Sequence, residues 1–303
     1  CDRAMNSGIE IMDKALVFDL IIKNGQVIGI KVKHDGKIKE IHSNVVIAAD
    51  GIGSKIVLRA SLRKPWNNDI DIGKCAVAFV SNYNLKNERI DANYNQFYLS
   101  NEIAPNAYSW IFPLSNNLVN IGLGIHKLSG ANPMEYLKKF IQWQKIKHKF
   151  SNPKIIWKSN FPVPLCGIKG KTFTDGLIAV GDSVGFVSPM LGEGIYYAMW
   201  TGRFAAETAL EAHKKEDFTK KVLKSYKMKY RKKKFHSIFS THKILRDILM
   251  SDVEKNVNAI VKLAKTEEEA QIIIKTALAG DTREISSELM ERALFLIQRA
   301  INE

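Results

Sequence analysis

The sequence predicts an α/β fold with a second sheet and a helical C-terminus. Two apolar strand segments each end in an acidic turn, at 45–50 and 177–182, as strands of an open α/β sheet often do. From residue 203 onward the pattern is helical. Other segments alternate and carry β-branched or aromatic residues, which predicts a second, mostly antiparallel sheet. These segments are residues 73–83, 93–100 and 107–125.

Composition limits the classes of protein and of site. A chain of 303 residues with 46% hydrophobic content can bury a sizeable core, shared by two closely packed domains. Its three cysteines form no C-x-x-C pair and its seven histidines show no ligand spacing, so we expect neither a disulfide framework nor a metal site. The longest charge-free stretch, 103–125, contains two prolines and four asparagines, which excludes a membrane span there.

The first strands are predicted from their turns. Asn24-Gly25 separates two apolar runs, 15–22 and 26–33, and is a strong hairpin signal. A second turn at 34–36 leads to the apolar strand at 45–49. Further along, we expect a basic helix over 133–149 and strands around 154–164 and 172–180. Two segments read as capping boxes at helix starts, 251–254 and 266–269.

The segment 176–202 carries the most chemical information. An apolar strand runs into Gly181-Asp182, and after a loop Gly192-Glu-Gly194 opens a helix at Ile195. The carboxylate can accept hydrogen bonds from ligand hydroxyls, while the helix start offers unpaired N–H groups to an anion. Each piece taken alone can also be an ordinary turn or helix entry.

Two other stretches could carry chemistry. Asp50-Gly51 ends a strand where open α/β sheets bind nucleotides, although Asp-Gly turns are common. The second stretch can form an apolar cavity wall or simply an aromatic pair of core strands. Its residues are Tyr108, Trp110, Phe112 and Pro113, followed by Gly122 and Gly124.

Together these motifs resemble the geranylgeranyl reductase family of flavoproteins. The glycine-rich stretch at 181–194 is similar to the family's second FAD-binding segment, and 50–54 to its D-G-x-x-S segment. The aromatic stretch with its two glycines is similar to the family's Y-x-W-x-F-P…G-x-G pattern. The resemblance implies FAD contacts at Asp50, Gly51, Gly181, Asp182, Gly192, Gly194 and Ile195. It implies a substrate cavity lined by Tyr108, Trp110, Phe112, Pro113, Gly122 and Gly124.

The resemblance also implies a domain plan. A Rossmann-like FAD-binding domain would comprise 1–60 and 172–212, the substrate-binding sheet 61–171, and a helical region 213–303. The family's pyrophosphate turn, G-x-G-x-x-G, does not occur in the chain, which begins with Cys1. We therefore expect a segment of about one βαβ unit or more to precede it. The family often has a basic residue where this chain has Val57, so a basic contact to the pyrophosphate is in question there.

The implied function is FAD-dependent reduction of C=C bonds in geranylgeranyl chains of archaeal-type lipids or related prenyl carriers. Hydride would come from N5 of the reduced flavin, and the sequence identifies no proton donor. The alternatives are a flavin-dependent monooxygenase of the same fold and a non-catalytic lipid-binding module.

The net charge of +14 indicates an acidic partner. The basic segment 213–234 is either a solvated helix face or a contact to anionic membrane. We expect a prenylated lipid substrate, no nucleic-acid partner, and an electron donor, NAD(P)H or ferredoxin-like, that the sequence does not identify. We expect a cytoplasmic protein, either free or peripheral on the membrane.

Overall fold

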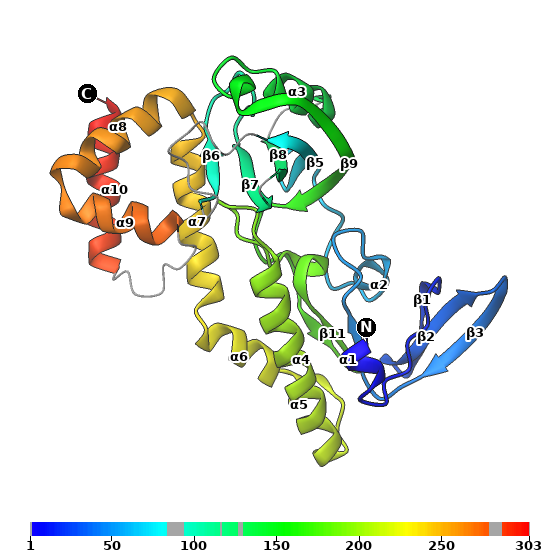
Figure 1. Cartoon of the computed structure of the whole chain (residues 1–303). Coiled ribbons are helices and arrows are strands. Elements are labelled where there is room, and N and C mark those ends of the chain that lie inside the picture. The colour runs from blue at the N-terminus through cyan, green and yellow to red at the C-terminus, as the bar shows by residue number, and fades with distance from the viewer. Residues whose placement is uncertain (1, 84–93, 116, 127–129, 279–286, 303) are drawn as a thin grey trace. The chain divides into compact units, whose positions relative to one another are not determined.

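The computed structural model describes residues 2–83, 94–115, 117–126, 130–278 and 287–302 (Figure 1). Its contacts divide the chain into two compact units. Unit 1 comprises Cys1–Pro65, Ile168–Phe186 and Gly194–Lys233. Unit 2 comprises Trp66–Gly167, Val187–Glu193 and Lys234–Glu303. This division differs from the domain plan expected from the sequence. Residues 61–65, 168–171 and 213–233 lie in unit 1, 187–193 lies in unit 2, and 234–303 belongs to unit 2 and is not a separate region.

Unit 1 begins with the short helix α1 (Asp2–Met5) and a three-stranded antiparallel sheet. Its strands are β1 (Leu16–Lys23), β2 (Gln26–His34) and β3 (Lys37–His42). Asn24 and Gly25 have φ of 52° and 81°, as a type I′ hairpin turn requires, so the predicted hairpin is confirmed. Strand β3 was not predicted. Its side chains are all exposed and mix isoleucine with lysine and glutamate, which gives a weak strand signal.

The second sheet of unit 1 has the order β10-β11-β4 and joins segments far apart in sequence. Its strands are β10 (Phe173–Thr174), β11 (Leu177–Ala179) and β4 (Val46–Ala48). Strand β11 pairs with β4 in parallel and with β10 antiparallel. The short helix α2 (Lys55–Arg59) follows β4.

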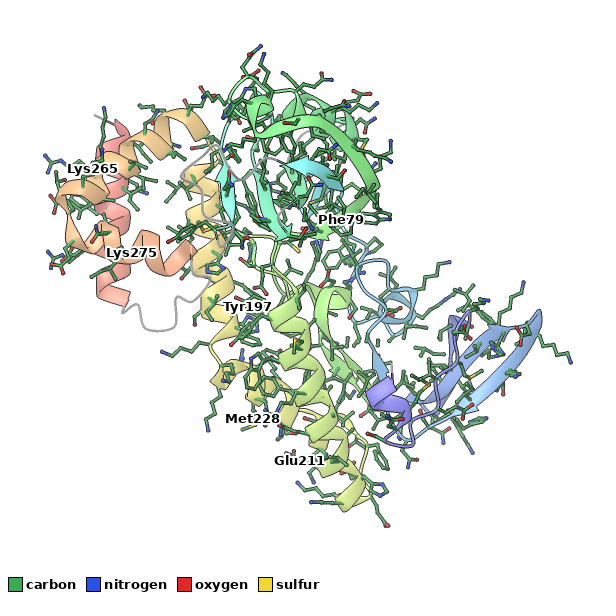
Figure 2. The ribbon with its side chains drawn as sticks, viewed as in Figure 1. Phe79, Tyr197, Glu211, Met228, Lys265 and Lys275 are labelled. Carbon is green, nitrogen blue, oxygen red and sulfur yellow. The ribbon has the colours of Figure 1, made fainter. Side chains whose placement is uncertain are left out.

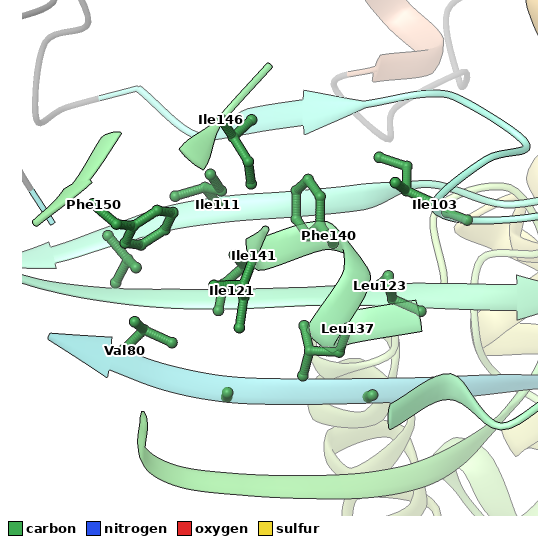
Figure 3. Close-up of a cluster of buried hydrophobic side chains, with 14 of the residues drawn as sticks. Val80, Ile103, Ile111, Ile121, Leu123, Leu137, Phe140, Ile141, Ile146 and Phe150 are labelled. Carbon is green, nitrogen blue, oxygen red and sulfur yellow. The ribbon is translucent and has the colours of Figure 1, made fainter. Parts of the chain in front are cut away.

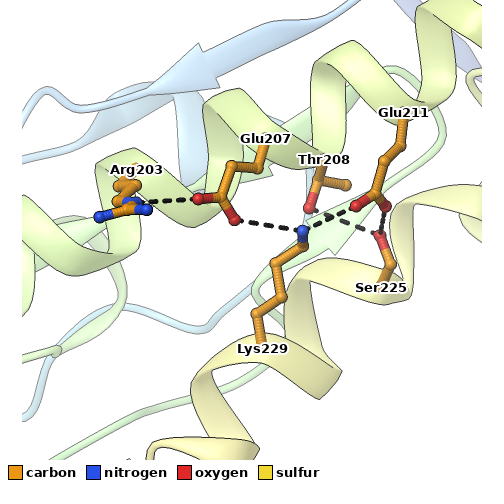
Figure 4. Close-up of polar contacts among 6 residues, drawn as sticks. All are labelled: Arg203, Glu207, Thr208, Glu211, Ser225 and Lys229. Carbon is orange, nitrogen blue, oxygen red and sulfur yellow. Dashed lines mark hydrogen bonds and ion pairs between the residues drawn. The ribbon is translucent and has the colours of Figure 1, made fainter.

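Three helices complete unit 1: α4 (Ile195–Lys215), α5 (Lys220–Leu223) and α6 (Ser225–Lys232). Tyr226 of α6 is fully buried and donates a hydrogen bond to the carbonyl oxygen of Ala179 at 2.9 Å, which ties α6 to β11. On α6, Lys229 pairs with Glu211 at 2.7 Å and Glu207 at 3.2 Å, both on α4 (Figure 4). Residues 213–233 of the predicted basic segment 213–234 are therefore a folded part of unit 1.

Unit 2 contains a five-stranded antiparallel sheet of order β6-β7-β8-β5-β9, which confirms the predicted second sheet. Its strands are β5 (Ile72–Tyr83), β6 (Gln96–Tyr98), β7 (Ser109–Ser115), β8 (Leu118–His126) and the long β9 (Phe150–Pro164). Residue 93 of the predicted strand 93–100, and residue 116 of 107–125, lie outside the described residues.

One face of this sheet forms the core of unit 2. Helix α3 (Pro133–Ile141) packs Leu137, Phe140 and Ile141 against alternate residues of the central strands (Figure 3). The strand residues include Val80, Ile111, Ile121 and Leu123, all fully buried. Helix α3 is shorter than the predicted 133–149: it ends at Ile141, and only a 3-10 turn, η1 (Lys147–Lys149), follows before β9.

The C-terminal helices of unit 2 are α7 (Phe235–Leu249), α8 (Val253–Thr266), α9 (Glu268–Leu278) and α10 (Ser287–Asn302) (Figure 1). The capping-box predictions place both helix starts incorrectly. Asp252, not Ser251, caps α8 by accepting a hydrogen bond from the Lys255 N–H, and Thr266 is the last residue of α8. Among the described residues, no helix has both the length and the apolarity needed to cross a membrane.

Two glycines of unit 1 allow a sharp test of this backbone. Gly176 has φ of 72°, and a Cβ there would lie 2.0 Å from the carbonyl oxygen of Val27. Gly36 has φ of 74° but no heavy atom within 4 Å of its Cβ position. Gly36→Ala should cost about 1 kcal/mol of unfolding free energy, for the left-handed conformation alone. Gly176→Ala should cost about 3 kcal/mol, because the backbone must also shift.

Denaturant unfolding of the two variants measures this difference. Equal losses would mean that the 175–177 turn does not pack on β2.

Candidate functional site

In unit 1, the two acidic turns follow neighbouring parallel strands. Ala48 pairs with Ala179, and the Val180 N–H donates to the Ala48 carbonyl at 3.0 Å, so both chains leave the sheet at the same edge. Asp50 and Asp182 therefore follow adjacent carboxyl ends, where ligands bind to open α/β sheets. Gly51, beside the exposed Asp50, has φ of 72° and turns the chain away from β4.

The Gly181-Asp182 turn is fixed by α4. Gly181 has φ of 55°, its N–H donates to Thr201 Oγ1 at 3.1 Å, and a Cβ there would lie 3.2 Å from the Ala198 Cβ. The Asp182 carboxyl is half-buried. Burial raises its pKa, and a hydrogen bond from its own backbone N–H partly offsets this. Among the described residues, no other residue donates to this carboxylate, so it can accept hydrogen bonds from a ligand.

Arg63 joins the two turns, and no local sequence pattern selects it. Its Nε donates to the Ser183 carbonyl at 2.9 Å, and Nη2 donates to the Ile52 carbonyl at 3.1 Å. The side chain is buried, with 7% of the residue exposed. One guanidinium thus fixes the backbone after β4 to the backbone after β11. Val57, which occupies the family's basic position, is a fully buried core residue.

Helix α4 begins at Ile195, and its N-cap, Gly194, has no side chain to cap the helix. In its first turn Ile195 is 78% exposed, whereas Tyr197 is fully buried. The positive end of the helix dipole lies at this start and favours an anionic or electron-rich group.

In unit 2, β7 separates core residues from an aromatic surface. Ser109 and Ile111 are fully buried on the core face, whereas Tyr108, Trp110 and Phe112 lie on the opposite face. Their rings are contiguous, with Tyr108–Trp110 and Trp110–Phe112 centroids both 5.9 Å apart. Phe97 of β6 contacts Tyr108 and Phe112 edge-on, at 5.5 and 5.4 Å.

The two glycines of β8 make room for this surface. Trp110 pairs with Gly122, and a Cβ at that glycine would lie 2.2 Å from the indole ring. The indole N–H donates to Asn120 Oδ1 at 2.9 Å, which fixes the ring over the glycine. A Cβ at Gly124 would lie 3.5 Å from Ala107, in ordinary contact. Pro113 pairs with Val119 and precedes the bulge at which β7 ends.

The surface extends across the sheet to β5 and β9. By register, Gly122 and Asn120 of β8 lie beside Val77 and Phe79 of β5. Phe79, labelled in Figure 2, contacts Trp157 of β9 with ring centroids 5.1 Å apart. We call the six rings of Phe79, Phe97, Tyr108, Trp110, Phe112 and Trp157 the aromatic face. Phe97 and Trp157 are nearly half exposed, which is unusual for apolar side chains of this size when they cluster.

Tyr108 connects the aromatic face to the loop Val187–Glu193, hereafter the 187–193 loop. Its hydroxyl donates a hydrogen bond to the Leu191 carbonyl. Burial raises the pKa of Tyr108, and the nearby Cys75 and Glu193 add to the rise, so the phenol stays protonated. Burial also raises the pKa of Cys75 to about 12, so the thiol on this surface is neutral.

The residues selected from the sequence thus form two groups. Unit 1 brings together the turns of Asp50-Gly51 and Gly181-Asp182, and contains Gly194 and Ile195 at the start of α4. Unit 2 contains the aromatic stretch, both β8 glycines and Gly192, whose φ is 65°. Three residues were missed, because only long-range contacts identify them: Arg63 in unit 1, and His242 and Arg246 of α7, which contact Ser188 and Pro189 of the 187–193 loop.

Comparison with known proteins places these features in a family. Residues 72–159, which include β5 to β8 and most of β9, match the model of the geranylgeranyl reductase catalytic domain. The chain is similar in fold to a geranylgeranyl bacteriochlorophyll reductase-like protein of Thermoplasma acidophilum. The TM-score is 0.80 at 23% identity, over 99% of this chain and 72% of that protein.

Two curated relatives are digeranylgeranylglycerophospholipid reductases. Reductase 2 of Methanococcoides burtonii is 35% identical over 256 residues, and the reductase of Methanocaldococcus jannaschii is 35% identical over 254 residues. The matches cover 84% and 83% of this chain, which spans 60% and 63% of the lengths of these relatives. From the matched catalytic domain and these relatives, we conclude that the chain belongs to the geranylgeranyl reductase family.

Proposed function

We propose that the intact protein is an FAD-dependent reductase of C=C bonds in the geranylgeranyl chains of archaeal-type lipids. The observation that carries this proposal is the aromatic face, six contiguous or paired rings on the solvent-facing side of a sheet whose other side is core. A prenyl chain has no polar groups, so rings and glycines can bind it by burying apolar area without leaving hydrogen bonds unsatisfied.

The residues of unit 1 fit one half of an FAD site in a Rossmann-like domain. Two neighbouring parallel strands end in Asp-containing turns, and glycines with positive φ occupy both. The half-buried Asp182 carboxylate accepts no hydrogen bond from another described residue, which suits an acceptor of ribityl or ribose hydroxyls. The start of α4, where the positive end of the helix dipole lies, suits the electron-rich edge of a reduced flavin ring.

Bound FAD would supply the redox chemistry, a hydride (two electrons and one proton) for one alkene carbon, and the second proton would come from water or an acid. This chain's side chains would bind the prenyl chain, exclude water from it and hold the alkene still. Tyr108 keeps its proton and uses it to hold Leu191, so it is a structural donor in this arrangement.

Product analysis tests the proposed function. The intact protein, loaded with FAD and reduced without oxygen, should convert digeranylgeranylglycerophospholipid into products heavier by one H2 per reduced bond. Dependence on oxygen with an oxygenated product would instead support a monooxygenase of the same fold. Flavin binding without any turnover would support the non-catalytic module.

The first prediction from this proposal concerns Asp182. Asp182→Ala should weaken FAD binding by the intact protein roughly 10- to 100-fold, the loss expected for hydrogen bonds to a charged group. Asp13→Ala removes an equal charge at an exposed position of the same unit and should leave affinity unchanged. Fluorescence titration of the flavin measures both. If Asp182→Ala bound FAD with wild-type affinity, Asp182 would be a turn residue without a role in FAD binding.

The second prediction uses neighbouring residues on opposite faces of β7. Trp110→Leu removes part of the aromatic face and should raise KM for a long prenyl lipid, with a small effect on unfolding. Ile111→Ala lies on the core face and should lower the unfolding free energy by about 2–5 kcal/mol while activity per folded molecule is kept. If Trp110→Leu lowered the unfolding free energy and left KM unchanged, Trp110 would serve only in packing.

The third proposal concerns membrane contact through the outer side of α5 and α6, the exposed part of the basic segment. Lys221, Lys224 and Lys232 are exposed there, and Met228 projects from α6 with 65% exposure (Figure 2). Lys229 is excluded, since it pairs with Glu207 and Glu211. Anionic headgroups attract such cations with about 1 kcal/mol each. This contact would bring a protein otherwise expected to be cytoplasmic to its lipid substrate.

Replacing these three lysines by glutamine should reduce cosedimentation with anionic vesicles roughly ten- to a hundredfold. The matched control replaces Lys255, Lys262 and Lys265, exposed on α8, with the same change in charge. Equal losses in the two triple variants would mean that net charge alone, and not this surface, causes vesicle binding.

A further inference from the structure

The 187–193 loop is closed by hydrogen bonds around Ser188. The Ser188 N–H donates to the Glu193 carbonyl at 2.9 Å, and the Gly192 N–H donates to the Ser188 carbonyl at 2.9 Å. The Leu191 N–H donates to Ser188 Oγ at 3.1 Å. Ser188 is 1% exposed, so its hydroxyl is removed from solvent. The loop conformation therefore depends on what holds this one side chain.

Helix α7 holds it. The buried stripe of α7 is apolar except for two residues, His242 and Arg246; its other members are Phe235, Ile238, Phe239 and Leu245. His242 Nδ1 lies 2.8 Å from Ser188 Oγ. Arg246 Nη1 donates to the Leu165 carbonyl at 2.5 Å and, at 3.5 Å, to the Pro189 carbonyl. Both polar side chains of the stripe thus bind the loop or the strand end beside it.

The histidine is placed there at an energetic cost. It is fully buried, and no described residue bonds its Nε2 atom. A buried polar atom without a partner is unfavourable, and an apolar side chain at this position would avoid the cost. Burial lowers the pKa of His242 to about 4, so the ring is neutral near pH 7 and one ring nitrogen can accept. The bond to Ser188 is the one polar interaction that the structure gives this ring.

We propose that His242 is a positioning residue that acts through Ser188, and that Arg246 assists it at Pro189. Together they hold the 187–193 loop in the conformation in which Gly192 would contact the flavin. The role of this loop in flavin binding rests on the proposed function. The contact that holds the loop, between His242 and Ser188, does not depend on it. The C-terminal helices thereby take part in cofactor binding through α7.

The test compares three substitutions on α7 in the intact protein. His242→Leu removes the bond to Ser188, whereas His242→Asn can keep a polar atom near the Nδ1 position. Ile238→Val removes one methylene from the same buried stripe and is the matched control. His242→Leu should weaken FAD binding roughly three- to tenfold and alter the visible circular dichroism of the flavin. His242→Asn should restore both, and Ile238→Val should leave both unchanged.

A second readout needs no cofactor. In the FAD-free protein, hydrogen exchange at the Leu191 and Gly192 amides should be roughly three- to tenfold faster in His242→Leu than in Ile238→Val. This separates the two hypotheses: an intact protein that binds no flavin would contradict the proposed function, while the exchange rates would still decide the role of His242.

Ser188→Ala removes the same bond from the loop side and serves if His242→Leu fails to fold. Its effects on exchange and on FAD binding should match those of His242→Leu, and the double variant should be no worse than either single variant. The proposal is overturned if His242→Leu leaves exchange and the flavin spectrum unchanged. It is also overturned if His242→Leu and His242→Asn weaken FAD binding equally. A third contradicting result would be a double variant whose loss equals the sum of the losses in His242→Leu and Ser188→Ala.

Discussion

The parallel pairing of β4 with β11 is the interaction on which unit 1 depends. Each strand has only three residues, and they are separated by about 130 positions, so neither could persist without tertiary support. Leu177, Ile178 and Ala179 are all fully buried, and the Tyr226 hydroxyl donates a hydrogen bond to the Ala179 carbonyl. Phe186 packs edge-on against Tyr226 and Tyr230, which adds a ring cluster beside the pair. Both acidic turns owe their common edge to this pairing.

The buried guanidinium of Arg63 adds precision at that edge. Its donors satisfy carbonyls of both turns, which would otherwise be free to move independently after such short strands. A cation held by carbonyl oxygens also leaves positive potential near a site proposed to bind phosphates. The position expected for a basic residue, Val57, is core instead. The chain therefore supplies a nearby positive charge from a different place in the sequence.

The core face and the aromatic face of the unit 2 sheet result from the two-residue alternation of side chains along a strand. Because successive side chains point to opposite faces, β7 sends Ile111 into the core and Trp110 to the aromatic face. Gly122 and Gly124 contribute by having no side chain, so the indole can lie against the sheet backbone. A one-residue slip of this strand would move its core side chains to the aromatic face and its aromatic side chains into the core.

Local signals in the sequence were sufficient for much of this structure. Asn24-Gly25 identified the first hairpin, and the spacing of Tyr108, Trp110 and the two glycines identified the sheet that carries the aromatic face. Signals that depend on tertiary contacts were not visible. Strand β3 has exposed, charged residues, and the true N-cap Asp252 competes with the adjacent Ser251. Arg63 and His242 act over 120 and 54 residues, respectively, and no spacing rule finds them.

The central claim is that the aromatic face binds the prenyl chain. Photo-crosslinking tests it most directly, with a digeranylgeranyl lipid that carries a diazirine on one prenyl chain and with the intact, FAD-loaded protein. The account predicts adducts in the peptides of β6, β7 and β9 that contain Phe97, Trp110 and Trp157, and competition by unlabelled lipid. Competed adducts confined to α8–α10 or to the β1–β3 sheet would contradict it.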